Sequence, residues 1–300
     1  MPDPLVYFDR YQQRLETEAI YGDAFLRWAY ENPLGRATTW LLVKRAIFSH
    51  WYGWRMNRPA SAAKIPPFLE KFGIDTTEMA DDPARFANFN AFFSRRLKPS
   101  ARPIAGVDDQ TVVFPADGRQ LVIPNLAERS DIYVKGIPFD VAALLGDASL
   151  AERYRQGSAL ISRLCPVDYH RYHFPIGGMA GAPRLINGPL YSVNPIALRR
   201  RPTLLWENKR YLTLLETQTV GQVLLLEIGA TCVGTVVHTS QPGSSVKKGD
   251  EKGYFLFGGS CFMTLFEPGR VKFDEDLVTH SAEGREVYAR MGDHCAQAVL

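Results

Sequence analysis

The chain has few cysteines and no long uncharged stretch, and both absences limit what it can be. Its four cysteines, Cys165, Cys232, Cys261 and Cys295, are scattered over 300 residues without a C-x-x-C pair. This usage argues against a disulfide framework or a cysteine-based zinc site, and it predicts reduced thiols in a cytosolic compartment. No run of about 18 uncharged apolar residues is present to span a bilayer, and we expect no secretory signal at the N-terminus.

The chain also lacks a strong charge of one sign, an internal repeat and a low-complexity segment. The net charge of +3 and the pI of about 8.6 are too weakly basic to predict a nucleic-acid partner, although they suit an anionic membrane. With 46% hydrophobic residues, the chain can bury a sizeable core. We therefore expect one large domain, or a domain with an appendage.

Residue patterning predicts an α+β fold with two unlike regions. Short helical pieces follow one another through residues 63–98, whereas β-branched and aromatic runs dominate from about residue 110 onward. The proline-containing stretch at 99–104 is the plausible boundary, giving a helical N-terminal region at 1–104 and a β-rich catalytic core at 105–300. The expected strands of that core are Thr111–Phe114, Ile132–Lys135, Ala159–Leu164, Arg210–Glu216, Gln222–Ile228 and Thr231–Thr239, with helical insertions at Phe139–Leu145 and Leu150–Gln156.

Residues 36–58 combine a helical aromatic stripe with cations. The stripe consists of Trp40, Val43, Ile47, Trp51 and Trp54, and the cations are Lys44, Arg45, Arg55 and Arg58. A helix of this composition either lies in the headgroup layer of a membrane or packs its aromatic face on the rest of the protein. Three of the five tryptophans of the chain fall in this segment, which favours lipid because tryptophan prefers the membrane interface.

The stretch at 246–273 contains a break in a strongly apolar pattern. Two expected strands, Tyr254–Phe257 and Phe262–Phe266, are separated by two glycines and Ser260. One interpretation is a glycine bulge or tight hairpin. The other is chemical: glycine can hold the Gly259–Ser260 peptide in a strained form, so that the serine hydroxyl attacks the preceding carbonyl. Elimination from the resulting ester, followed by hydrolysis, would leave an N-terminal pyruvoyl group.

The chemical interpretation requires a base and a group that orients it. His170 and His173 lie in C-P-V-D-Y-H-R-Y-H-F-P, and Asp117 lies in F-P-A-D-G-R directly before a glycine. A metal site is weakly supported because no third ligand accompanies the two histidines. Asp117 is equally consistent with an ordinary Asp-Gly turn. The residues alone therefore make an Asp117, His173 and Ser260 arrangement possible without requiring it.

Several motifs together resemble the phosphatidylserine decarboxylase family over nearly the whole chain. They are N-F-N-A-F-F-S-R-R-L-K-P-S-A-R-P-I at 88–104, F-P-A-D-G at 114–118, D-Y-H-R-Y-H-F-P at 168–175, G-P-L-Y-S-V-N-P at 188–195 and K-G-D-E-K-G-Y-F-L-F-G-G-S at 248–260. The resemblance implies self-cleavage between Gly259 and Ser260, which gives a β chain of residues 1–259 and an α chain of residues 260–300. It also implies that Ser260 becomes a covalent pyruvoyl cofactor.

The resemblance also implies a role for each candidate residue. Asp117 would orient His173, which would take the proton of Ser260 during cleavage, as in the triad of serine hydrolases. His170 would transfer a proton during decarboxylation, in which phosphatidylserine forms a Schiff base with the pyruvoyl group and leaves as phosphatidylethanolamine and CO2. No metal is implied. The implied partners are phosphatidylserine and a membrane surface, with the protein bound peripherally on the cytoplasmic face of the cell membrane. The two chains of the cleaved protein would form a heterodimer, and further homodimerisation stays open.

Two rival functions remain open at the level of sequence. One is a serine hydrolase that uses the same triad on an external ester, although Ser260 lacks the G-x-S-x-G elbow. The other is a non-enzymatic lipid-binding relative that has lost cleavage. One departure from the family is also visible: Cys261 stands where threonine or serine is commoner. Because cysteine is small, we expect cleavage to survive there.

Overall fold

The computed structural model describes residues 4–20, 22–39, 46–128, 139–230, 236–258 and 260–299. Its α-helices are α1 Asp23–Glu31, α2 Pro33–Thr38, α3 Ala46–Met56, α4 Ile65–Phe72, α5 Phe89–Phe93, α6 Val141–Leu145, α7 Ala148–Tyr154, α8 Pro195–Leu198, α9 Leu204–Glu207 and α10 Glu275–Ala282. Its strands are β1 Val6–Asp9, β2 Arg14–Thr17, β3 Thr111–Val113, β4 Gly118–Ile123, β5 Ser158–Leu164, β6 Arg171–His173, β7 Gly178–Ala180, β8 Arg184–Ile186, β9 Arg210–Glu216, β10 Gln222–Ile228, β11 Val236–His238, β12 Ser244–Val246, β13 Glu251–Phe255, β14 Ser260–Phe266, β15 Val271–Phe273, β16 Val287–Ala289 and β17 His294–Ala298.

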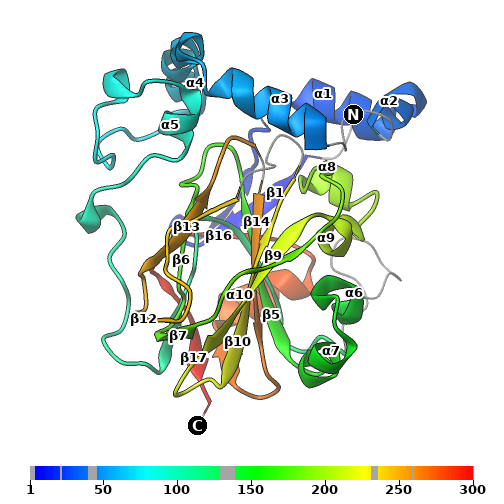
Figure 1. Cartoon of the computed structure of the whole chain (residues 1–300), viewed down its shortest axis with the longest axis vertical. Coiled ribbons are helices and arrows are strands. Elements are labelled where there is room, and N and C mark those ends of the chain that lie inside the picture. Colours follow the sequence, from blue (N-terminus) through cyan, green and yellow to red (C-terminus); the bar gives the residue numbers. More distant parts are fainter. Residues whose placement is uncertain are drawn as a thin grey trace.

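A large mixed sheet forms the centre of the protein (Figure 1). In the part of the chain that the structure describes, it has 11 strands in the order β12-β7-β9-β10-β14-β5-β4-β16-β1-β2, with β8 paired to β9. The neighbours of β14 are both antiparallel, and Ser260 lies opposite Leu164 of β5. Two smaller sheets, β11-β13-β6 and β15-β17-β3, complete the β structure. The β-rich core that the sequence predicted is thus present, and the fold is mixed α+β.

The central strands are buried on both faces, which explains their almost uninterrupted apolar sequences. In β14, Phe262 and Phe266 face one hydrophobic cluster, while Met263 and Leu265 face another. The first cluster fills the space toward the two small sheets and α10. The second is covered by α6 to α9, which lie along one side of the main sheet in Figure 1. The result is a layered core with β14 in its middle.

The helices of the N-terminal region form a third cluster at one end of the sheets (Figure 1). Helix α4 ends at Gly73, which adopts the left-handed conformation that favours glycine at this position. Helix α5 begins after Asn88, whose side chain accepts a hydrogen bond from the Ala91 amide. Aromatic rings from α3 and α5 pack against Phe257, the last large residue before the G-G-S sequence. The helical region therefore packs directly on the segment that leads to Ser260.

The structure differs from the sequence prediction in the N-terminal region and at the end of one strand, and some predicted segments cannot be compared. The N-terminal region is not wholly helical, because β1 and β2 form a hairpin whose first strand pairs with β16 of the main sheet. Strand β13 ends at Phe255, two residues earlier than expected. The expected strand at 132–135, the first half of that at 231–239 and residues 40–45 of the amphipathic segment lie outside the described residues. Within the described ranges, no helix is both long and apolar enough to cross a membrane.

Candidate active site

Ser260 lies at the first position of a fully buried central strand. Its side chain is inaccessible to solvent, and its hydroxyl oxygen has no hydrogen-bond partner among the described residues. Gly259, which precedes it, lies outside those residues, whereas Gly258 adopts a φ of 141° that is rare for residues with a side chain. A buried hydroxyl without a partner is costly for a folded protein.

His170 lies just before β6 against the aromatic end of the helical region. Its ring is stacked on Phe93 with 3.8 Å between the ring centroids, and its Nδ1 is 3.0 Å from the carbonyl oxygen of Asp168. Its Nε2 is buried without a partner. Burial lowers the pKa of His170 to about 3, although the backbone of Asp168 and Gly258 opposes that shift. The imidazole is therefore neutral at physiological pH and lies beside the segment that leads to Ser260.

His173 is the last residue of β6, and a hydrogen bond of its backbone amide fixes its position. Its amide donates to the carbonyl oxygen of Pro115 at 2.8 Å, and its ring stacks on Tyr169 with 5.8 Å between centroids. The ring Nδ1 is buried without a partner. Burial lowers the pKa of His173 to about 4, against the opposing charges of Glu251 and Asp117. A neutral imidazole with an unoccupied nitrogen is the form that a general base requires.

Asp117 approaches the site from the bend before β4. Gly118 is required there because a side chain would meet the carbonyl oxygen of Arg163 at 2.4 Å. The Asp117 carboxylate accepts two bonds of 2.9 and 2.6 Å from the Nε and Nη2 of Arg102, and a third of 2.8 Å from the Met291 amide. No hydrogen bond joins it to His173 in the described structure. The charge of Asp117 nevertheless acts to raise the pKa of His173, against the larger effect of burial.

The predicted site residues come from two layers that pack face to face. His170 and His173 flank Tyr172, whose ring lies 5.2 Å from that of Phe262 on the strand that begins with Ser260. Each of three predicted site residues has a buried polar atom without a hydrogen-bond partner among the described residues, namely Ser260 Oγ, His170 Nε2 and His173 Nδ1. These atoms fit a group formed from Ser260 itself, because they supply the nucleophile and two neutral proton acceptors without any further ligand. Their exclusion from solvent would also protect a reactive ketone from water.

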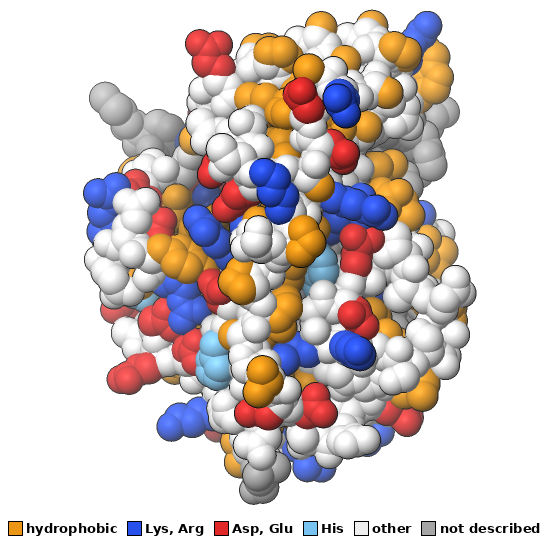
Figure 2. All heavy atoms as spheres, turned by 90° about the vertical axis from the view of Figure 1, so that its left-hand side faces the viewer, with side chains coloured by type: hydrophobic (Ala, Val, Ile, Leu, Met, Phe, Trp, Pro, Cys, Tyr) orange, Lys and Arg blue, Asp and Glu red, His pale blue; other side chains and the backbone are white. Residues whose placement is uncertain are grey.

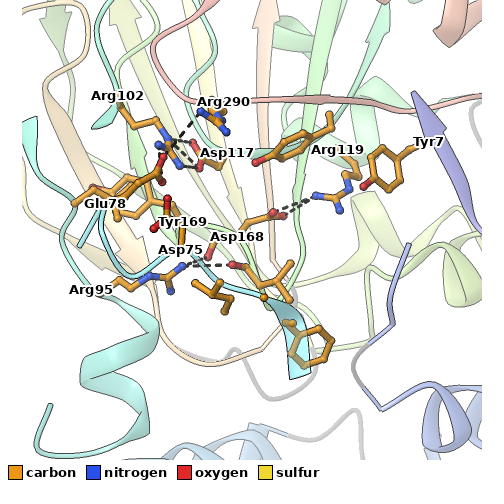
Figure 3. Close-up of a pocket in the computed structure, with 16 residues that line it drawn as sticks. Tyr7, Asp75, Glu78, Arg95, Arg102, Asp117, Arg119, Asp168, Tyr169 and Arg290 are labelled. Atoms are coloured by element: carbon orange, nitrogen blue, oxygen red, sulfur yellow. Dashed lines mark hydrogen bonds and ion pairs between the residues drawn. The ribbon is translucent and has the colours of Figure 1, made fainter. Parts of the chain in front are cut away.

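A hollow of about 310 Å³ is lined by Asp117 but by none of Ser260, His170 and His173 (Figure 3). Asp117 and Asp168 line it together with the side chains of Arg95, Arg102 and Arg119. Arg119 Nη1 is 3.1 Å from the Asp168 carboxylate, and burial raises the pKa of that carboxyl group while Arg119 opposes the shift. Sequence reasoning assigned no role to these arginines. Arg95 and Arg102 lie in the basic motif S-R-R-L-K-P-S-A-R, which could have suggested a charged site. The carboxylates that line the hollow with them lie elsewhere in the sequence.

The residue after Ser260 is a buried thiol. Cys261 is a free cysteine, and burial raises its pKa to about 12. The thiol is therefore protonated at neutral pH and does not compete with Ser260 as a nucleophile. Cys165 and Cys295 are likewise free and buried, whereas Cys232 lies outside the described residues. The prediction of reduced thiols is confirmed for these three.

A buried serine after two glycines, in a protein whose nearby motif supplies two neutral histidines, is compatible with an enzyme that makes its cofactor by cutting its own chain. Comparison with known proteins is more specific. The profile of the phosphatidylserine decarboxylase family matches residues 89–297. The chain belongs to the phosphatidylserine decarboxylase family.

Curated relatives resemble the chain over almost its whole length. The phosphatidylserine decarboxylase proenzyme of Chlamydia trachomatis serovar L2 is 44% identical over 288 residues, which cover 96% of this chain and 95% of the relative. The proenzymes of Chlamydia felis and of Clostridium botulinum strain Alaska E43 are 42% and 39% identical, and the matches cover 98% of this chain in both cases. They cover 98% and 99% of those relatives. The family suggested by the sequence motifs is thereby confirmed.

Proposed function

We propose that the chain matures by cleavage between Gly259 and Ser260 and that Asp117, His173 and Ser260 carry out this step. The chain is a phosphatidylserine decarboxylase proenzyme, and such a proenzyme must process itself to the pyruvoyl enzyme. The proposal is carried by one observation: Ser260 Oγ, His170 Nε2 and His173 Nδ1 are buried polar atoms without partners. Leaving such atoms buried in three of the predicted site residues is costly unless they take part in a reaction.

In the proposed maturation, His173 removes the proton of the Ser260 hydroxyl as it attacks the carbonyl carbon of Gly259. The carbon–nitrogen bond breaks, and an ester to the serine oxygen takes its place. Removal of the α-proton then expels the Gly259 carboxylate and leaves dehydroalanine, whose hydrolysis releases ammonia and yields pyruvoyl. Asp117 stabilises the protonated His173 through its charge. Arg102 and the Met291 amide fix the position of that carboxylate.

In the decarboxylation, the pyruvoyl group supplies a ketone that binds the substrate amine and accepts the electron pair left by CO2. We assign His170 to proton transfer at the carbon that loses the carboxylate. Phe93 and the Asp168 carbonyl hold the ring, so that Nε2 remains available. A positioned group that transfers a proton contributes about 10²–10⁴-fold. The product of the reaction is phosphatidylethanolamine.

We further propose that helix α3 places the enzyme on the membrane surface as a peripheral protein on the cytoplasmic face. Its Tyr52 and Met56 pack inward, whereas Trp51 and Trp54 are 48% and 55% exposed. The guanidinium of Arg58 lies 4.7 Å from the centroid of the Trp54 ring. Hydrophobic side chains gather with scattered cations at the helical end in Figure 2. An in-plane helix with aromatic and basic side chains suits a lipid headgroup layer.

Intact-mass measurement of freshly purified protein tests the maturation. We expect a fragment of the 41 residues from 260 to 300, about 4.6 kDa in proportion to the 33.7 kDa of the chain, with a blocked amino end. The Ser260→Ala variant should remain a single chain. A fragment that begins with a free serine amine would rule out the pyruvoyl assignment. Cleavage of Ser260→Ala would remove Ser260 from the mechanism.

A further inference from the structure

Strand β13 has an irregular register beside the base that is proposed for maturation. Its Gly253 is paired with Tyr172 of β6. In a regular antiparallel register, the neighbours of this pair, Lys252 and His173, would stand opposite one another. The register shifts at this point instead, and Glu251 is the residue paired with His173. The bulge therefore places a carboxylate, and not a cation, opposite the proposed base.

The bulged lysine has its own partner on the main sheet. Lys252 and Glu227 of β10 are both fully buried, and Lys252 Nζ lies 2.6 Å from Glu227 Oε1. His238 Nε2 of β11 lies 3.1 Å from the other oxygen of the same carboxylate. A buried cation is costly without such a partner. The ion pair thus stabilises the bulge that brings Glu251 to its position.

The carboxylate of Glu251 is fixed on the face of β6 that carries His173. Arg171 and His173 are two residues apart in this strand, so their side chains share one face. Arg171 Nη1 donates to both oxygens of Glu251, at 2.8 and 2.7 Å. The hydroxyl of Thr239 donates to Glu251 Oε1 at 2.9 Å. Directly opposite residues of an antiparallel pair have their Cβ atoms about 5 Å apart, which brings this oriented carboxylate close to the His173 side chain.

Several charged groups act on His173 from the elements around it. Burial has the largest effect on the pKa of His173 and lowers it, whereas Glu251 of β13 raises it more than Asp117 does. Arg171 of the same strand lowers this pKa by less than either carboxylate raises it. Tyr169, which stacks on the ring, is uncharged at neutral pH because burial raises its pKa. Both oxygens of Asp117 are already bound by an arginine and a backbone amide.

We propose that Glu251 is a positioning residue for maturation, whose carboxylate stabilises the protonated form of His173 while the Ser260 hydroxyl attacks. The proposal rests on the proposed function, in which His173 is the base. The proton moves from the Ser260 hydroxyl to His173 and then to the Ser260 nitrogen as the peptide bond breaks, so Glu251 neither gains nor loses a proton. A positive charge that forms in a buried site interacts more strongly with a nearby carboxylate than it would in water.

The rate of self-cleavage of newly translated chain at neutral pH tests this role. Glu251→Gln removes the charge, and Glu251→Asp restores it on a shorter side chain. Asp250→Asn is the matched control, because Asp250 is the neighbouring carboxylate but is exposed. Glu251→Gln should slow cleavage roughly tenfold or more, the loss that corresponds to one pKa unit of stabilisation of the protonated base. Glu251→Asp should recover part of the rate, and Asp250→Asn should leave it unchanged. Normal cleavage of Glu251→Gln would overturn the proposal.

The pKa of His173 separates this role from a structural one. NMR titration of the His173 ring in the Ser260→Ala chain should give a lower pKa when Glu251→Gln is added. An unchanged pKa would overturn the proposal, because slower cleavage would then reflect a structural change.

If Glu251→Gln does not fold, Arg171→Gln is added to it so that neither charge of the ion pair is left alone. The pKa of His173 should still be lower than in the parent, because Glu251 has the larger effect of the two. A pKa at or above that of the parent would contradict the proposal. Failure of the proposed function gives a different result: normal cleavage of His173→Ala would show that His173 is not the base, whatever its pKa.

Discussion

The surroundings of Ser260 and those of helix α3 differ in which kind of group is buried and which is exposed. Around Ser260, buried polar atoms lack partners and the histidines are neutral, whereas on helix α3 large apolar rings are exposed beside arginines. Both arrangements are unfavourable for an isolated soluble protein. The contrast is what we would expect if, as proposed, one end carries out a reaction that excludes water and the other contacts a membrane surface.

The largest expected effect separates the two histidines of the buried site. His173→Ala and Asp117→Ala should accumulate intact chain, because the base or its orienting charge is lost. His170→Ala should cleave normally but decarboxylate about 10²–10⁴-fold more slowly. Denaturing gels and turnover of phosphatidylserine measure the two steps separately. Normal processing of His173→Ala would remove the triad from the proposal.

Removing Arg102 should destabilise the same site. Asp117 is only 2% exposed, so Arg102→Gln leaves a buried carboxylate without its cation at a cost of about 3–5 kcal/mol. Urea unfolding of the Ser260→Ala chain with and without Arg102→Gln measures this change. Arg290→Gln is the control, because Arg290 lines the same hollow but its side chain is 44% exposed. Equal losses in the two variants would show that the Arg102–Asp117 pair has no special importance.

Lowering the pH should reduce the free energy of unfolding through the two buried histidines before it affects the exposed helix α3. A histidine titrates near 6.5 in the unfolded chain, but burial lowers the pKa of His173 to about 4 and that of His170 to about 3. From pH 6.5 downward the unfolded chain therefore binds protons that the folded chain does not. The free energy of unfolding should fall by up to about 1.4 kcal/mol per pH unit for each histidine.

Urea unfolding of the Ser260→Ala chain at about pH 6.5 and about pH 5 measures this slope. His173→Gln should reduce the slope by the contribution of one proton. An unchanged slope in that variant would show that His173 is not held neutral by the fold.

The smallest expected effect concerns the exposed end. Replacing Trp51 and Trp54 with serine should release the protein from anionic liposomes in flotation, since each ring contributes apolar area at the interface. Stability should change by no more than about 0.5 kcal/mol per site because both side chains are exposed. Self-cleavage should be unaffected. Flotation equal to that of the unmodified protein would mean that α3 serves packing alone.

The sequence predicted the central strands well because they are buried on both faces and carry unbroken apolar runs. Strands β9 and β10 have the predicted bounds, and β5 begins one residue earlier. The hairpin of β1 and β2 was missed because its strands have four residues each and pair with β16, at the opposite end of the chain. Pairing over such a distance leaves no local signal.

The candidate site could be predicted as a set of residues but not as a geometry. Asp117, His170, His173 and Ser260 were predicted from motifs, and the structure places all four in the interior. Their roles remain predictions. The motifs did not indicate that Arg102 holds Asp117 or that Arg95 is unpaired, because ion pairing depends on residues 15 or more positions away.

The position of β14 determines what happens to the protein after it is cut. Strand β14 is hydrogen-bonded on one side to β10 and on the other to β5, while β16 lies between β4 and β1. If the chain is cut at the proposed bond, residues 260–300 are interleaved with the larger piece at more than one place in the sheet. Cleavage of one peptide bond leaves these pairings intact, so the two products cannot separate by dissociation of a surface. They should part only when the whole sheet unfolds, and the cut protein behaves as one inseparable molecule without any covalent bond between its pieces.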